Sequence, residues 1–214
     1  MDVLVESLLT YFCLIIVITA HEAAHAWVAW KCGDPTAKRQ GRVSLNPVVH
    51  MDPIGTVALP LLALGLAASH SALAGLIIGW GRPVPFNPAN LSRPRLHESL
   101  ISVAGPAMNV VLAFVAILLA RLLGMAGWGA LTQTAIFLAH LSLFLCFFNL
   151  LPIPPLDGSH LLKHAIGMSD EQYAQIARYG FLIIIMIIQI PAVQRLLMVA
   201  TSGTARFLAV MVGI

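Results

Sequence analysis

The chain has 214 residues, of which 59% are hydrophobic and 10% charged, and its mean hydropathy is +0.88. This composition excludes an ordinary soluble domain and indicates a polytopic membrane protein. The formal net charge of +3 comes from dispersed Lys and Arg residues, without the basic run typical of a nucleic-acid-binding protein. We therefore expect an all-α polytopic membrane protein that has no nucleic-acid partner.

The first apolar stretch extends from Val3 to Trp30, and as a helix it can cross a hydrocarbon core about 30 Å thick. It lacks the basic start and the small-residue cleavage site of a secretory signal, so we expect it to be retained. The stretch contains His21-Glu22-Ala23-Ala24-His25. Residues four positions apart share one face of a helix, so both imidazoles can bind one metal ion with the Glu22 carboxylate beside it. Zinc proteases use this arrangement for two ligands and a general base.

A chance occurrence of the motif is the alternative interpretation, because the chain contains eight histidines. Ionisable side chains within a membrane span are costly, however, and usually mark a functional site. We therefore treat His21, Glu22 and His25 as candidate site residues.

The region between this helix and the next long span is interrupted by turn residues. Residues 31–53 are polar and rich in turn signals, and residues 54–79 are apolar but broken by proline and glycine. Residues 83–88 then contain three prolines, which exclude a helix. We expect residues 79–88 to form a strand-like, re-entrant segment at membrane depth, covered by protein or lining a water-filled cavity.

The rest of the chain contains further apolar stretches of spanning length. They are expected at about Leu100–Leu123 and Leu131–Leu150, with additional candidates at Tyr173–Ile190 and Leu196–Ile214. The sequence contains no internal repeat and no boundary of a soluble domain. We expect one intramembrane domain over residues 1–214, with its core over residues 4–165 and C-terminal helices over residues 173–214.

A catalytic zinc site needs a third protein ligand and an open position for water. Asp157 is the candidate, because it directly follows an apolar span that three prolines (Pro152, Pro154, Pro155) bring to an end. Gly158 allows the backbone to turn back toward the membrane. An ordinary Asp-Gly turn at a membrane exit is the alternative interpretation.

Other histidines compete for a place in the site. His160 and His164 are also four residues apart, but they lack an intervening glutamate and adjoin Lys163, which favours a solvated helix end. His50 lies between two turn signals near the expected membrane surface and is a further candidate for substrate binding. A role in loop packing is the alternative for His50.

Several motifs follow one another along the chain. They are His21-Glu22-x-x-His25, Ala104-Gly105-Pro106-x-x-Asn109, and Asn149-x-x-Pro152 followed by Leu156-Asp157-Gly158. In this order they resemble the site-2 protease family of intramembrane zinc metalloproteases, over about residues 10–165. The segments Gly41-Arg42-Val43-x-Leu45-Asn46-Pro47-x-x-His50-x-Asp52-Pro53 and Pro83-Val84-Pro85-x-Asn87-Pro88 resemble its compact prokaryotic subgroup, which lacks PDZ and CBS domains.

The resemblance implies a three-helix catalytic core with a strand-like re-entrant element, and one zinc ion per chain held by His21, His25 and Asp157. Glu22 would be the catalytic base, and Asn149 would lie beside the site and help to hold substrate. The implied activity is hydrolysis of peptide bonds within or near the transmembrane segments of membrane proteins, as in regulated intramembrane proteolysis. The expected partners are a transmembrane protein substrate and the lipid bilayer. Residues 54–78 are an insertion relative to the minimal core of the family.

Two other functions use the same residues. A metal ion transporter or sensor could use His21, His25 and Asp157 as an ion path, but it has no need for Glu22, a base that is not a ligand. A catalytically inactive binding protein of the same fold is the second alternative. The presence of both Glu22 and Asp157 argues against it.

A shared metal site determines the direction of the helices. The two histidines lie toward the end of the first helix, and Asp157 follows the helix at 131–150, so these two helices must run parallel. Residues 54–79 therefore cannot be a single crossing and must return to the same side. The Lys and Arg residues outside the spans then divide nine (Lys31, Lys38, Arg39, Arg42, Arg82, Arg93, Arg95, Lys163, Arg178) against two (Arg121, Arg195). This bias predicts a cytoplasmic active-site mouth and an outside N-terminus in the cell membrane.

Overall fold

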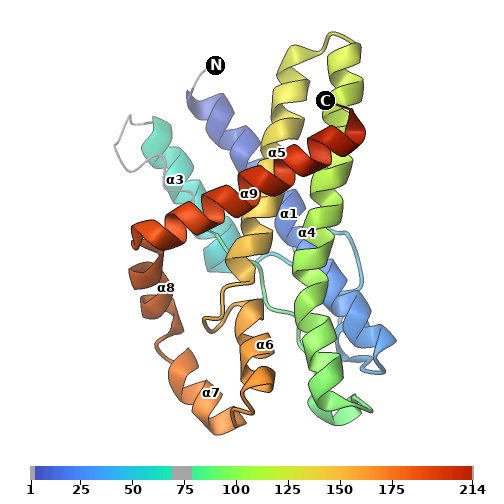
Figure 1. Cartoon of the computed structure of the whole chain (residues 1–214), viewed down its shortest axis with the longest axis vertical. Helices are drawn as coiled ribbons and strands as arrows, with labels where there is room; N and C mark the ends of the chain where they lie inside the picture. The colour runs from blue at the N-terminus through green and yellow to red at the C-terminus, as the bar shows by residue number, and fades with distance from the viewer. Residues whose placement is uncertain (1–2, 69–78, 214) are drawn as a thin grey trace.

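The computed structural model describes residues 3–68 and 79–213, and the regular secondary structure in these ranges is entirely helical (Figure 1). The helices are α1 (Val3–Lys31), α2 (Thr36–Arg39), η1 (Pro47–Val49), η2 (Pro53–Ala58), α3 (Leu59–Ala68), η3 (Pro88–Asn90), α4 (Pro94–Met125), α5 (Gly129–Asn149), α6 (Asp157–Ala165), α7 (Asp170–Ala177), α8 (Gly180–Ile188) and α9 (Pro191–Val212). Within the described ranges, four segments are long and apolar enough to cross a membrane: Val5–Lys31, Pro94–Met125, Gly129–Asn149 and Pro191–Val212. The prediction of an all-helical membrane protein is confirmed.

A bundle of α1, α4 and α5 forms the centre of the molecule, and α4 packs against both of the other helices. Figure 1 shows that α1 and α5 run in one direction and α4 in the other, as the sequence predicts. Small side chains bring α4 and α5 together, because Ala113, Ala116 and Ala139 are almost completely buried around Leu143. Helix α9 crosses the outside of α4 and α5 and contributes Leu208 to the same cluster (Figure 1).

The predicted span at Tyr173–Ile190 is wrong, because the chain bends between α7 and α8. Helix α7 ends at Ala177, and α8 begins at Gly180. A Cβ atom at Gly180 would overlap the carbonyl oxygen of Pro154, so the backbone packs here directly against the loop that precedes α6. The fourth spanning segment is instead α9, which overlaps the predicted candidate at Leu196–Ile214 but begins earlier, at Pro191.

The two ends of the apolar insertion lie side by side. Met51 and Gly81 form an antiparallel β-bridge, and the backbone N–H of Arg82 donates to the carbonyl oxygen of His50 at 2.8 Å. The buried Arg42 side chain also donates to the carbonyl oxygen of Arg82, at 3.1 Å. The chain therefore leaves and returns at one level, as the parallel helices require. Residues 69–78, the last part of the insertion, lie outside the described residues.

Residues 79–87 follow as an extended segment, and the prediction that they are not helical is confirmed. Gly81 pairs with Met51 in an isolated β-bridge, and the described ranges contain no β-strand. Thr56 of η2 donates its hydroxyl to the carbonyl oxygen of Trp80 at 2.6 Å. A Cβ atom on Gly55 would lie 2.5 Å from the Trp80 ring, so the glycine provides the space for the indole.

Asp34 joins the end of α1 to the end of the extended segment. Its fully buried carboxylate accepts hydrogen bonds from the backbone N–H and the hydroxyl of Thr36, from the backbone N–H of Asn87 and from Nδ2 of Asn90. Burial alone would raise the pKa of Asp34, but these hydrogen bonds outweigh burial and hold the pKa below its ordinary value.

We predict that Asp34→Ala lowers the free energy of unfolding by about 2–4 kcal/mol, because it leaves buried donors without an acceptor. Since the folded pKa of Asp34 lies below the ordinary value of 3.8, its stabilisation is present above that pH and is lost as the pH falls through the folded pKa. Asp34→Asn should abolish the contribution of this side chain to the loss of stability at low pH. Thermal unfolding of the detergent-solubilised protein at several pH values measures both effects. The exposed Glu171 supplies the matched control, and an equal loss for Glu171→Ala would contradict the assignment.

Candidate metal centre

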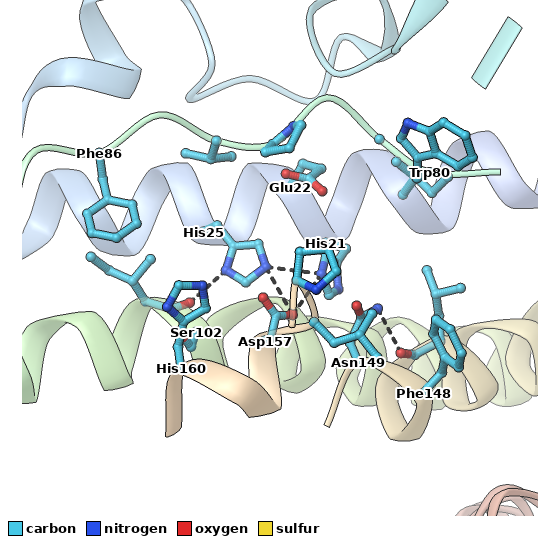
Figure 2. A pocket seen from close by; sticks show the side chains of 18 of the residues that line it. His21, Glu22, His25, Trp80, Phe86, Ser102, Phe148, Asn149, Asp157 and His160 are labelled. Atoms are coloured by element: carbon cyan, nitrogen blue, oxygen red, sulfur yellow. Dashed lines mark hydrogen bonds and ion pairs between the residues drawn. The ribbon is translucent and has the colours of Figure 1, made fainter. Parts of the chain in front are cut away.

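Three side chains from α1 and α6 converge on one point inside the molecule (Figure 2). His21 and His25 lie one turn apart on α1 and are buried, and their Nε2 atoms are 3.0 Å from each other. Oδ2 of Asp157, the first residue of α6, lies 3.2 Å from Nε2 of His21 and 3.4 Å from Nε2 of His25. The structure thus brings together the three residues that the sequence suggests as metal ligands.

The spacing of these atoms fits a tetrahedral metal ion. Ligand atoms at about 2.0–2.1 Å from zinc in a tetrahedral site are separated by about 3.3–3.4 Å. The observed separations of 3.0, 3.2 and 3.4 Å bracket this value. Oδ2 of Asp157 is buried and accepts no hydrogen bond in the described part of the chain, although it is a carboxylate oxygen. A divalent cation at the point of convergence would satisfy this oxygen and both nitrogens together.

The other nitrogen of each imidazole is held by α4. Nδ1 of His25 lies 2.6 Å from the carbonyl oxygen of Ile101, and because a carbonyl can only accept, Nδ1 carries the proton and Nε2 keeps its lone pair. The fully buried amide of Asn109 lies against His21, with 3.1 Å between Nδ2 and Nδ1. An asparagine amide can present either end, and with its oxygen toward Nδ1 it accepts that proton and leaves Nε2 for a metal.

Helix α4 approaches the histidines most closely at Gly105. A Cβ atom on Gly105 would overlap Nε2 of His25 and would lie 2.5 Å from Cε1 of His21. Any other residue would displace the rings or separate α1 from α4. Gly105 therefore belongs to the site although it contributes no functional group.

A cavity of about 370 Å³ opens beside the three ligand atoms. The Glu22 carboxylate lines it from α1, and Figure 2 shows Glu22 between the metal-ligand cluster and the extended segment. Trp80 and Phe86 line the cavity from the extended segment, and Asn149 lines it from the end of α5. The cavity therefore offers space for a water molecule, a carboxylate base and a largely apolar wall beside the three ligand atoms.

The remaining predicted site residues have different positions. His50 is fully buried in its loop, its Nε2 lies 2.8 Å from the carbonyl oxygen of Ser44, and it is absent from the cavity lining. This is the loop-packing role given as the alternative. His160 lines the cavity, whereas Nε2 of His164 lies 3.0 Å from Oε2 of Glu98, so these two histidines do not converge as a ligand pair.

Sequence reasoning missed the positioning role of residues on α4. Gly105 and Asn109 occur in a motif that the resemblance includes, but nothing in their spacing to His21 indicates contact across 80 or more positions. Ile101 acts through its backbone carbonyl, which no side-chain pattern can reveal.

Burial, the largest effect on His160, holds the pKa of its imidazole below the ordinary 6.5, so the neutral ring is favoured at neutral pH.

Sequence comparisons with known proteins identify relatives that are named as zinc metalloproteases. The model of peptidase family M50 matches residues 120–188. The chain is 36% identical over 195 residues to YwhC of Bacillus subtilis, which covers 86% of this chain and 83% of that protein. It is 31% identical over 176 residues to Rip2 of Mycolicibacterium smegmatis, covering 82% of this chain and 64% of that protein. It is also 48% identical to MJ0611 of Methanocaldococcus jannaschii over 63 residues, 29% of this chain and 32% of that protein.

Each of these three relatives is named "Putative zinc metalloprotease". No solved structure matches the chain with significance. The similarity to YwhC extends over most of both chains. The chain therefore belongs to peptidase family M50, the site-2 protease family, and is a zinc metalloprotease with several membrane-spanning helices.

Proposed function

We propose that the protein is an intramembrane metalloendopeptidase that hydrolyses peptide bonds within or near the transmembrane segments of membrane proteins. The convergence of His21 and His25 on the spanning helix α1 with Asp157 at the start of α6, beside Glu22, carries this proposal. In it, α1, α4 and α5 form the catalytic core. The family membership supports the reaction type, and the burial of the site among spanning helices supports the class of substrate.

His21, His25 and Asp157 would hold one zinc ion through two nitrogens and one oxygen, a ligand set that catalytic zinc sites use. When bound, zinc supplies a Lewis acid that polarises the scissile carbonyl and makes a water molecule more acidic. Glu22 takes the proton from the attacking water and delivers it to the leaving nitrogen. The water oxygen forms a bond to the carbonyl carbon, the C–N bond breaks, and the two products leave as a carboxylate and an ammonium group that carries both protons of the water.

A transmembrane helix hides its carbonyl groups in hydrogen bonds, so the substrate must unwind at the site, and each freed backbone group then needs a partner. The extended segment at residues 79–87 supports such pairing, because Val84 lines the cavity and its backbone N–H has no partner among the described hydrogen bonds. Strand addition of this kind is a common way to bind an extended peptide. Asn149 lines the same cavity and would hold the substrate from α5.

The charges at the two ends of the bundle support a cytoplasmic mouth. Eight basic residues lie at the end where α1 leaves, the extended segment returns and α4 begins: Lys31, Lys38, Arg39, Arg42, Arg82, Arg93, Arg95 and Lys163. The turn between α4 and α5 has Arg121 near it. Arg178 and Arg195 carry no weight in this comparison, because the span expected at Tyr173–Ile190 is not a single helix. The positive-inside rule then places the eight residues in the cytoplasm and the N-terminus outside.

We predict that Glu22→Gln lowers kcat/KM by about 10²–10⁴-fold, because the amide keeps the size of the side chain and cannot accept the proton. Zinc content should remain at one ion per chain, since Glu22 is not among the convergent ligand atoms. Cleavage of single-span proteins by the purified enzyme, with and without a chelator, is measured beside metal analysis. Retained cleavage by Glu22→Gln would remove Glu22 from the mechanism.

For the topology, cysteines are placed at Lys38 and Arg93 in a protein that lacks Cys13, Cys32 and Cys146. Both positions should be protected from a membrane-impermeant thiol reagent in intact cells and should react once the membrane is opened. A cysteine at Arg121 is the control and should react in intact cells. Reaction at only one of Lys38 and Arg93 would mean an odd number of crossings between them and would contradict the arrangement.

A further inference from the structure

A chain of hydrogen-bonding groups lies behind the cavity and ends at His160. The Ser159 hydroxyl donates to the carbonyl oxygen of Leu156 at 2.6 Å, and its oxygen lies 2.9 Å from the Tyr173 hydroxyl. The Tyr173 hydroxyl lies 3.2 Å from Nε2 of His160, and the two rings are in contact, with centroids 5.0 Å apart. Helix α7, which carries Tyr173, thereby reaches the wall of the cavity although it lies outside the bundle.

The carbonyl oxygen of Leu156 determines which group donates in each of these hydrogen bonds. A carbonyl oxygen can only accept, so the single hydroxyl proton of Ser159 is committed to Leu156. Tyr173 must then donate its proton to Ser159, and its oxygen accepts from Nε2 of His160. The neutral His160 ring therefore carries its proton on Nε2 and has a lone pair on Nδ1. Nδ1 has no protein partner in the described part of the chain.

His160 lies on the cavity wall, where the Nδ1 lone pair can face a bound substrate. His160 lies three residues after Asp157 on α6, and its side chain lines the cavity. Figure 2 shows His160 and Asn149 on opposite sides of Asp157, with Phe86 and Trp80 of the extended segment across the cavity. A peptide lying between these walls can pair one backbone edge with the extended segment and present its other edge to His160.

We propose that His160 is a substrate-binding residue whose Nδ1 accepts a hydrogen bond from a backbone N–H of the unwound substrate near the scissile bond. The inference rests on the proposed proteolytic function and adds a residue to it. An unwound backbone N–H in an apolar cavity is costly without an acceptor. Among the other polar residues lining the cavity, Glu22 serves the water, and the amide oxygen of Asn149 is a second acceptor on the opposite side of Asp157.

Tyr173 acts on the substrate only through His160 and is a positioning residue. Its hydroxyl holds the proton of His160 on Nε2, which keeps Nδ1 an acceptor. Without that hydroxyl the ring can place its proton on either nitrogen, and part of the population would present a donor to the substrate N–H. This assigns to α7, which follows the predicted catalytic core, a role in substrate binding.

The test uses the purified full-length enzyme and a synthetic transmembrane peptide whose cleavage site has been mapped with the wild type. In a series of peptides, single backbone amides near that site are replaced by esters, which removes one N–H at a time. One ester should lower kcat/KM of the wild type by about tenfold, the size of one hydrogen bond. His160→Ala should show a similar loss with the all-amide peptide, mainly through KM, and little further loss with that ester.

Matched variants separate hydrogen bonding from folding. His160→Asn should recover most of the loss, because its amide oxygen lies near the position of Nδ1, and Tyr173→Phe should show an intermediate loss. All three variants should keep one zinc ion per chain. His140→Ala is the control, since His140 is exposed on α5 outside the cavity lining.

The possible results separate an error in the role of His160 from an error in the proteolytic function. Equal ester penalties in the wild type and His160→Ala at every position would overturn the role of His160, and so would an unchanged kcat/KM for His160→Ala. Loss of zinc from both His160→Ala and His160→Asn would assign His160 to the metal site instead and would also overturn the proposal. If the proteolytic function itself were wrong, the wild type would cleave none of the peptides, with or without zinc.

Discussion

The approach of α4 to α1 at Gly105 is the contact on which the metal centre depends. A Cβ atom at this position would overlap the imidazole of His25, so the absence of a side chain allows the two helices to meet at the level of the ligands. The same approach brings the Ile101 carbonyl and the Asn109 amide to the outer nitrogens of the two rings. Buried imidazoles bind a metal well when such partners orient them. The packing of α4 against α1 and the orientation of the two histidine ligands therefore depend on the same contact.

The segments around the bundle satisfy a second requirement, that buried irregular backbone have hydrogen-bond partners. Asp34 joins the end of α1 to the extended segment, and Arg42 and His50 hold the Arg82 backbone from the loop. On the other side, α6 returns toward the bundle, so that Asp157 reaches the histidines and His160 reaches the cavity. A segment that cannot be helical is thereby held beside Glu22, where it lines the cavity.

Much of this arrangement is readable from the sequence because it depends on periodicity and on residue chemistry. The i, i+4 histidines, the prolines before Asp157 and the prolines of residues 83–88 predict the ligand face, the turn and the extended segment. The requirement that Asp157 meet the histidines predicts the parallel course of α1 and α5. The break at Gly180 is not readable, because it results from contact with Pro154, a residue far away in the chain. The contacts of Gly105, Asn109 and Tyr173 are likewise set by tertiary packing and leave no local signal.

The central claim is that one zinc ion is bound by two imidazole nitrogens and one carboxylate oxygen at the meeting point of α1 and α6. Zinc K-edge X-ray absorption of the purified protein measures the number, type and distance of the ligands directly. The account predicts one zinc ion per chain with nitrogen and oxygen ligands at about 2.0–2.2 Å, of which two are imidazoles. Asp157→Ala should lower the zinc occupancy while the imidazole signal of the remaining zinc persists. A sulfur ligand at about 2.3 Å, or an unchanged zinc site in Asp157→Ala, would contradict it.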